Sequence, residues 1–469
     1  MAAPPSCGRE TKTKSNINYL ARMMGIDLEH GVTEYHSPQD GIHAKYFDGS
    51  GLGGDFMRYL WDGALATHAK EECSAVYDFI VQYSDWDHDR VSTEVWMFGI
   101  SRGAYIVRSV AGMINNCGII RDIPHKAKLI EDKMIYDIYR NPHPVHHPSS
   151  PEMRDFRDKA SYAVRTPVKF MGLFDTVGSR GVPRLNYDSG TGFEWPEFYD
   201  ACVSTAVEKV YHAVSIHDRF WGFQPCLASR APPSKNNDNR ATTITSTSNN
   251  NLKIRQKWFP GCHYDLARQE FQFLREGASW KERLVFWLLN PLSKTVWPNH
   301  KLADLALLWI LQGIEREGGG ALVRKELDGR TDSDIGAAIV QTRQRILHLA
   351  GDRKHLIGTG DVYDDILSYL PGGRLLSAPI RWAKRMNETA YAVLFKGVER
   401  VIPDPGIGTD AEDAPVWNEV YDYTVPDTDG LGALGVAAIR DLAGVNEKRY
   451  PSRTFQKYRV YMQTVQRQP

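Results

Sequence analysis

The stretch TEVWMFGISRGAYIVRSVAGMI, residues 93–114, decides the fold class of this chain. Residues 93–99 are apolar enough for a buried strand, and residues 102–114 place apolar side chains at helical spacing. Between strand and helix, GISRG at residues 99–103 matches the pattern G-x-S-x-G. In this context the pattern predicts a nucleophile elbow, a strained turn that raises the Ser101 hydroxyl above a parallel sheet.

The elbow also assigns roles to the residues around the serine. We expect Gly99 and Gly103 to be required because a Cβ at either position would collide with the neighbouring helix and strand. The backbone N–H of Arg102 lies at the N-terminus of the expected helix, where it can stabilise an oxyanion. A structural turn without catalytic function is the alternative interpretation of the same pentapeptide.

A nucleophilic serine needs a base, and the base needs an orienting acid. In this fold the three follow the chain order Ser, Asp or Glu, His. Asp175 ends a predicted strand at 168–175, and His263 follows another at 254–261. Because the carboxyl ends of parallel strands meet at one edge of a sheet, we expect both side chains to lie near Ser101.

The identity of the acid stays open at this point. Asp175 has a second interpretation as a cap of the following turn or helix. Asp265, two residues after His263, is able to orient the histidine instead, or to stabilise its loop.

The rest of the chain predicts an α/β fold with a mostly parallel sheet flanked by helices, since strands alternate with helices. We expect an α/β-hydrolase-like catalytic domain at 1–315, with a disordered insertion at 229–251 that is almost free of large apolar residues. We expect a helical or irregular C-terminal extension at 316–469, packed on the core. Further predicted elements are a strand at 43–47 and helices at 16–25, 55–84, 206–218, 301–314, 334–350, 363–370 and 376–394.

Composition excludes several classes of function. The chain has 469 residues, with 57 Lys and Arg against 57 Asp and Glu, so no broadly basic surface for nucleic acid is expected. Its longest apolar runs, 284–289 and 302–310, are too short to span a bilayer, and no signal peptide precedes them. We therefore expect a cytoplasmic protein.

An aromatic and apolar patch at 280–289 has two interpretations, peripheral membrane contact or packing on the core. None of these sequence features sets the oligomeric state.

Five segments resemble successive motifs of an uncharacterised-domain family of α/β-hydrolases. The segments are GISRGAY, LFDTVGS, YHAVSIHDRFWGF, KWFPGCHYD and LADLALLWI. The family includes phospholipase effectors of the bacterial type VI secretion system and many fungal members, and the resemblance covers about residues 16–315. It implies Ser101 as the nucleophile, Asp175 as the triad acid and His263 as the base. It also implies an ester or phospholipid substrate, and this chemistry needs no metal or organic cofactor.

The sequence departs from the family pattern at two places. Family members usually begin with an apolar strand and Asp-Gly-Thr, whereas SCGRETKTKS precedes the first helix here, so a truncated gene model or loss of one oxyanion donor is expected. After the histidine, LARQ at 266–269 stands where the family tends to have glycines. A catalytically degenerate fold that binds or regulates is therefore the alternative to hydrolysis, and acyl transfer by the same triad is a third.

Overall fold

The computed structural model describes most of the region that surrounds the elbow. The described residues are 15–38, 40–48, 69–84, 93–121, 133–164, 166–177, 184–185, 193–194, 202–216, 218, 225–230, 252–269, 298–323, 335–348, 400 and 416–420. Predictions made for residues 1–14, 55–68, 231–251, 280–289, 363–370 and 376–394 lie outside these ranges.

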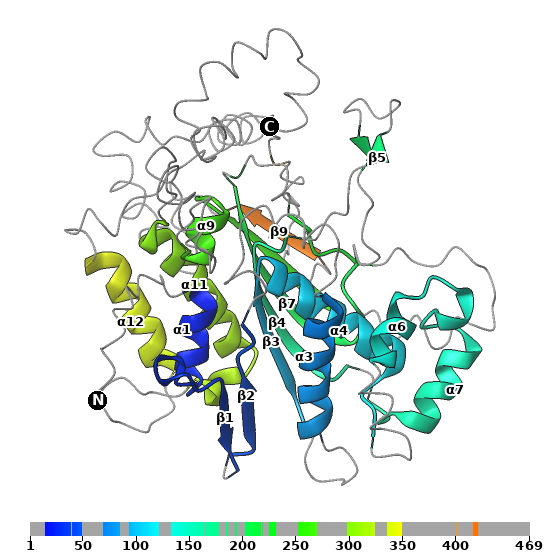
Figure 1. Ribbon diagram of the computed structural model, residues 1–469. Helices are drawn as coiled ribbons and strands as arrows, with labels where there is room; N and C mark the ends of the chain where they lie inside the picture. Colours follow the sequence, from blue (N-terminus) through cyan, green and yellow to red (C-terminus); the bar gives the residue numbers. More distant parts are fainter. Residues whose placement is uncertain are drawn as a thin grey trace, which may run out of the picture.

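A parallel sheet forms the centre of the structure (Figure 1). Its five described strands have the order β3-β4-β7-β8-β9, and every neighbouring pair is parallel. The fold prediction of an α/β protein with a mostly parallel sheet is therefore confirmed. The strands are β3 (Val95–Ile100), β4 (Val168–Phe174), β7 (Val207–Ser215), β8 (Lys253–Phe259) and β9 (Val416–Val420).

Helices cover both faces of this sheet (Figure 1). One layer contains α1 (Asn16–Met23), α9 (His263–Ala267), α11 (His300–Arg316) and α12 (Ile335–His348). The other contains α3 (Ala69–Tyr83), α4 (Arg102–Cys117), α6 (Met134–Arg140) and α7 (Pro151–Ala160). A strand covered on both faces reads as an unbroken apolar run, which explains the sequence of β3.

Strand β3 shows how the two layers share the sheet. Val95 and Met97 belong to the apolar cluster on the α4 side, whereas Trp96, Phe98 and Ile100 pack on the α11 side. This alternation follows from the two-residue period of a strand. The register puts Ile100 beside the last residue of β4, so the two strands end together.

The remaining described elements are short. Strands β1 (Glu34–Ser37) and β2 (Ile42–Lys45) form an antiparallel hairpin, and β5 (Arg184–Leu185) pairs with β6 (Phe193–Glu194) in another. The single-turn 3-10 helices are η1 (Leu28–His30), η2 (Pro144–His146) and η5 (Gly319–Leu322). Within the described part of the chain, no helix is both long enough and apolar enough to cross a membrane.

The prediction of a helix at 206–218 is wrong, because residues 207–215 form strand β7. Val207, Val210, Tyr211 and Val214 repeat at spacings of three and four, which imitates the apolar face of a helix. The segment lies between β4 and β8 and is buried along most of its length, so both of its faces need apolar side chains. Short apolar runs of this kind cannot be assigned by periodicity alone.

The other predicted elements that fall on described residues are confirmed to within a few residues at their ends. Strand β9 and Arg400 both come from the region assigned to the C-terminal extension, and β9 pairs with β8. The division of the chain at residue 315 stays a prediction.

Candidate active site

Ser101 lies on a strained turn between β3 and α4. Its backbone angles are φ 55° and ψ −122°, in a region that residues other than glycine rarely occupy. The turn is tied to the next strand, because the Ser101 N–H donates to the Phe174 carbonyl at 2.9 Å. A Cβ on Gly99 would lie 2.6 Å from the backbone of Ala104, so the strand and the helix approach each other too closely for a larger residue. These features match the predicted elbow.

The prediction that a Cβ on Gly103 would collide is wrong. Apart from the adjoining residues and the backbone of α4 itself, no atom of the described residues lies within 4 Å of the position that a Cβ would occupy there. Gly103 is in the first turn of α4. Among the described residues, packing therefore requires a glycine at Gly99 and not at Gly103. Arg102 is the first residue of α4, and N–H groups of a first helical turn have no partner within the helix.

Asp175 follows β4 in a turn that the neighbouring strand β7 holds in place. Its φ is 41°, a left-handed conformation that aspartate tolerates better than most residues. Its N–H donates to the Ala213 carbonyl at 2.7 Å, and the Thr176 N–H donates to His212 Nε2 at 3.1 Å. The carboxyl group therefore projects from a backbone that is bonded on both sides of the residue.

His263 begins the short helix α9, after a three-residue turn that follows β8. Its N–H donates to Asp218 Oδ2 at 3.1 Å, which fixes the start of the helix. The side chain is buried, with 2% of its surface exposed. The helix thus presents the imidazole at the same edge of the sheet as the elbow.

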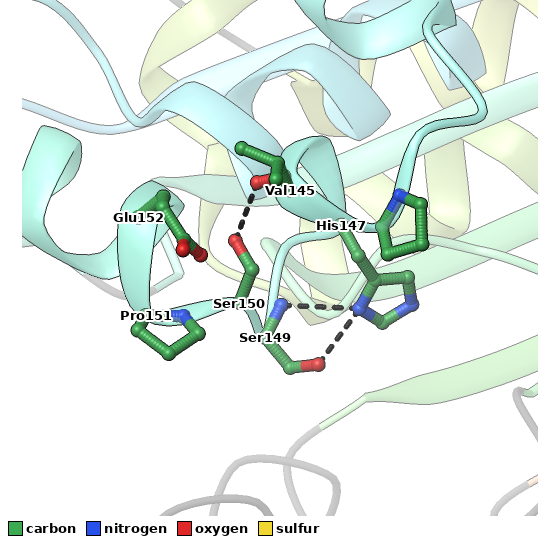
Figure 2. A pocket seen from close by; sticks show the side chains of 7 residues that line it. Val145, His147, Ser149, Ser150, Pro151 and Glu152 are labelled. Atoms are coloured by element: carbon green, nitrogen blue, oxygen red, sulfur yellow. Dashed lines mark hydrogen bonds between the residues drawn. The ribbon is translucent and has the colours of Figure 1, made fainter.

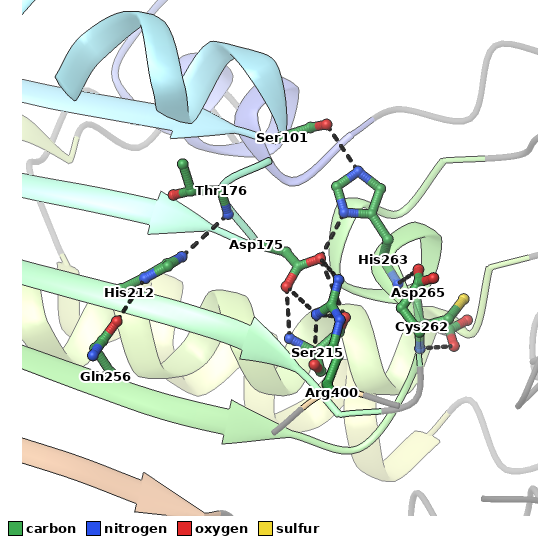
Figure 3. Close-up of polar contacts among 11 residues, drawn as sticks. Ser101, Asp175, Thr176, His212, Ser215, Gln256, Cys262, His263, Asp265 and Arg400 are labelled. Atoms are coloured by element: carbon green, nitrogen blue, oxygen red, sulfur yellow. Dashed lines mark hydrogen bonds and ion pairs between the residues drawn. The ribbon is translucent and has the colours of Figure 1, made fainter. Parts of the chain in front are cut away.

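The three predicted side chains meet at this edge (Figure 3). Ser101 Oγ lies 2.9 Å from His263 Nε2, and His263 Nδ1 lies 2.6 Å from Asp175 Oδ2. Because a carboxylate accepts and cannot donate, Nδ1 carries the proton and Nε2 is free to accept the serine proton. This is the geometry expected of a nucleophile, a base and an orienting acid, and the three residues follow the expected chain order Ser, Asp, His.

Asp265 has a different environment from Asp175. Its carboxylate accepts the Cys262 N–H at 2.9 Å and the Asn299 N–H at 2.6 Å. Burial raises the pKa of Asp265 to about 6. Asp175, not Asp265, lies against the histidine ring, so the bonds of Asp265 fit the loop-stabilising interpretation.

Two further residues bind the Asp175 carboxylate, and sequence reasoning missed both. Arg400 donates from Nη1 to Oδ1 at 2.6 Å and from Nη2 to Oδ2 at 2.9 Å. The Ser215 N–H donates to Oδ1 at 2.9 Å. Burial disfavours the charged form, but the guanidinium and the histidine bond outweigh it and hold the pKa of Asp175 well below its usual range.

His212 supports the same turn from within the sheet. Its Nε2 accepts the Thr176 N–H, so its Nδ1 carries the proton and donates to Gln256 Oε1 at 3.0 Å. Complete burial, with the positive charge of Arg108 adding to it, lowers the pKa of His212 to about 4. The ring is therefore a neutral structural link that joins β4, β7 and β8.

The segment YHAVSIHD at 211–218 contained a signal for two of the missed residues. Had it been assigned as a strand, Ser215 and Asp218 would have been expected beside Asp175, at the carboxyl end of the next strand. Arg400 carried no such signal, because it lies in VERVIP, a short segment without a recognisable motif and far from the elbow in sequence.

Helix α9 is anchored by α1 and α11, its neighbours in the same layer. Asn16 Nδ2 donates to the carbonyls of Leu266 at 2.8 Å and Ala303 at 2.9 Å. Arg268 Nε donates to Asn16 Oδ1 at 3.1 Å, and the guanidinium pairs with Asp304. These contacts are buried, so α1, α9 and α11 form one unit behind the histidine.

Arg268 stands where the family resemblance led us to expect glycines. Its φ is 57°, the left-handed region that favours glycine. Its guanidinium lies 4.6 Å from the centroid of the Tyr19 ring and contacts Asp304. The Arg268 side chain thus joins the end of α9 to α1 and α11.

A separate surface hollow of about 430 Å³ lies beside the N-terminus of α7 (Figure 2). His147, Ser149 and Ser150 line it, and their polar atoms already bond within the loop: Ser150 Oγ donates to the Val145 carbonyl at 2.6 Å, and His147 Nδ1 bonds Ser149 Oγ at 2.7 Å. It contains none of the predicted catalytic residues.

Comparison with known proteins agrees with this geometry. Residues 6–313 match the family described as the catalytic domain of type VI secretion system, Tle1-like phospholipase effectors. The chain belongs to this family.

The Tle1-like match extends beyond the elbow on both sides, from before α1 to within α11. The chain is also 29% identical over 180 residues to the uncharacterized protein YEL023C of Saccharomyces cerevisiae. That match covers 38% of this chain and 24% of the yeast protein. No solved structure matches significantly.

Proposed function

We propose that this protein is a serine hydrolase that cleaves a carboxylic ester of a lipid or phospholipid. The observation that carries the proposal is the contact of His263 with Ser101 Oγ on one side and Asp175 on the other, at 2.9 Å and 2.6 Å. Family membership supports the lipid ester as substrate class.

In the proposed mechanism, Ser101 Oγ attacks the ester carbonyl carbon while His263 Nε2 takes the hydroxyl proton. Asp175 holds the ring in the required tautomer and stabilises the imidazolium that forms. The Arg102 N–H, at the start of α4, contributes one of the hydrogen bonds to the oxyanion. His263 then returns the proton to the leaving alcohol, and a water molecule releases the acyl group by the same steps.

The strained elbow fits this role. Backbone strain of this kind persists only where the surrounding structure enforces it, and it gathers at functional sites. Ser101 is 8% exposed, so most of the residue is buried at the edge of the sheet.

The test is fatty-acid release from phosphatidylcholine vesicles by the wild type, Ser101→Ala and His263→Ala. We expect release by the wild type and loss of at least about 10³-fold in both variants. Vesicle binding without release by the wild type would support the alternative, a degenerate hydrolase fold that binds or regulates. Acyl appearing on an added alcohol in preference to water would indicate acyl transfer. Cytoplasmic location and peripheral membrane contact stay predictions.

A further inference from the structure

Arg400 is buried at the back of the candidate site, on the far side of Asp175 from His263 (Figure 3). It comes from beyond residues 6–313, the part of the chain that matches the family. We infer that Arg400 is a positioning residue, whose guanidinium holds both oxygens of Asp175 so that the carboxylate stays charged and aimed at His263. This inference rests on the proposed function.

The geometry is that of a two-point clamp. The Nη1 and Nη2 atoms of Arg400 lie 2.6 Å and 2.9 Å from the two oxygens of Asp175. Nη1 also donates to the Ser215 carbonyl at 2.6 Å, so the guanidinium is itself fixed to the end of β7. A planar guanidinium with parallel bonds sets both the position and the rotation of a carboxylate, which a single ammonium cannot do.

The clamp meets a need that the site creates. Asp175 is fully buried, and burial alone would favour the neutral acid. A neutral Asp175 would no longer require the proton on Nδ1 of His263, and the ring would lose the tautomer in which Nε2 accepts from Ser101. The guanidinium prevents this loss because its positive charge favours the ionised form of Asp175.

The other charged or titratable groups in this cluster do not replace Arg400. His263 is the ring that Asp175 orients, and His212 is a neutral link in the sheet. Asp218 and Cys262 act on Arg400 itself, and their negative forms favour its charge. Among these groups Arg400 supplies the positive charge to Asp175 throughout the reaction cycle.

The consequence concerns the organisation of the chain. The region after residue 315, predicted as an extension of the catalytic domain, contributes β9 to the sheet and Arg400 to the back of the site. Arg400 and β9 are therefore part of the catalytic unit.

The experiment measures pH–rate profiles for hydrolysis of 4-nitrophenyl butyrate by the full-length wild type, Arg400→Met and Arg400→Lys. In Arg400→Met we expect kcat to fall about 10²-fold with KM little changed, as for a group that is misplaced by a fraction of an ångström. Loss of a positive charge beside the Asp175–His263 pair favours protonation of the pair, so the acid limb of the pH–rate profile should move to higher pH. Arg400→Lys keeps the charge, so its acid limb should stay near that of the wild type while kcat is only partly restored.

Arg345→Met is the matched control, because Arg345 pairs with a buried aspartate, Asp304, outside this cluster. It should lower stability and leave the acid limb where it is. If Arg400→Met folds and both its kcat and its acid limb match those of the wild type, the inference is overturned. If Arg400→Met does not fold, a kcat of Arg400→Lys equal to that of the wild type overturns it. A wild type whose Ser101 is unreactive overturns the proposed function. A reactive wild type, together with an Arg400→Met variant whose kcat and acid limb are unchanged, overturns this inference alone.

Discussion

His263 Nε2 lies 2.9 Å from Ser101 Oγ, although 162 residues separate the two along the chain. The contact exists because β3 and β8 are parallel members of one sheet and both residues follow the carboxyl ends of their strands. The position of each residue is fixed by other contacts. The elbow and a bond to the Phe174 carbonyl fix the backbone of Ser101, and helix α9 and a bond to Asp218 fix that of His263. The preformed contact is the basis of the predictions below.

Asp175→Asn should lower kcat by about 10⁴-fold with a small effect on KM, because an amide permits the wrong imidazole tautomer. Steady-state kinetics on a 4-nitrophenyl ester measures this. Asp265→Asn is the matched control, since Asp265 is also buried at this edge but bonds backbone N–H groups. It should change stability more than kcat. A kcat for Asp175→Asn within tenfold of the wild type would contradict the assigned role.

The two elbow glycines should respond differently to alanine. Gly99→Ala places a Cβ 2.6 Å from the Ala104 backbone, so the strand or the helix must shift and both stability and activity should fall. Gly103→Ala meets no described atom within 4 Å outside the helix itself, and should keep its stability or gain up to about 1 kcal/mol from helix propensity. Urea unfolding of both variants measures the difference. Equal losses in the two would show that close packing at Gly99 is not the cause.

His212 predicts a component of the pH dependence of stability. Burial lowers the pKa of His212 to about 4 from its ordinary 6.5, so below pH 6.5 the unfolded chain binds a proton that the folded chain does not. The free energy of unfolding should therefore decrease as pH falls from 6.5 to 4, by about 3 kcal/mol from this residue. Urea titrations of the wild type and His212→Gln over this range test it. If the free energy of unfolding of His212→Gln falls as steeply with pH as that of the wild type, a group other than His212 causes the acid sensitivity.

Asn16 should stabilise the helix that presents the base. Asn16→Ala leaves the Leu266 and Ala303 carbonyls without their donor, which costs about 3 kcal/mol for buried groups. Asn18→Ala, on the same helix, removes the capping acceptor of Ser15 and a side-chain bond to Tyr46, and should cost about 1 kcal/mol. Chemical denaturation compares the two. The account of α9 is wrong if Asn16→Ala is no more destabilising than Asn18→Ala.

The sequence predicted the parts of the site that local pattern determines. A strand, a G-x-S-x-G turn and a helix follow one another without interruption, so the elbow at Ser101 was recognisable from 22 residues at 93–114. The chain order of the fold then predicted the meeting of Ser101 with Asp175 and His263. These inferences succeed because parallel strands bring their carboxyl ends together whatever the length of the connections.

The parts that failed depend on tertiary context. Strand β7 was assigned as a helix because the spacing of Val207, Val210 and Val214 suits either structure, and only burial between two other strands decides between them. Arg400 meets Asp175 across 225 residues of sequence, and no spacing rule links an isolated arginine to a carboxylate at that separation. The open space beside Gly103 likewise follows from the packing around α4.

The most direct measurement of the central claim is labelling with a fluorophosphonate probe, followed by mass spectrometry of the modified peptide. The probe reacts with a serine only when a neighbouring base has activated the hydroxyl. We expect one adduct, on Ser101, in the wild type and none in Ser101→Ala. An unlabelled wild type, or equal labelling of Ser101→Ala, would contradict the account.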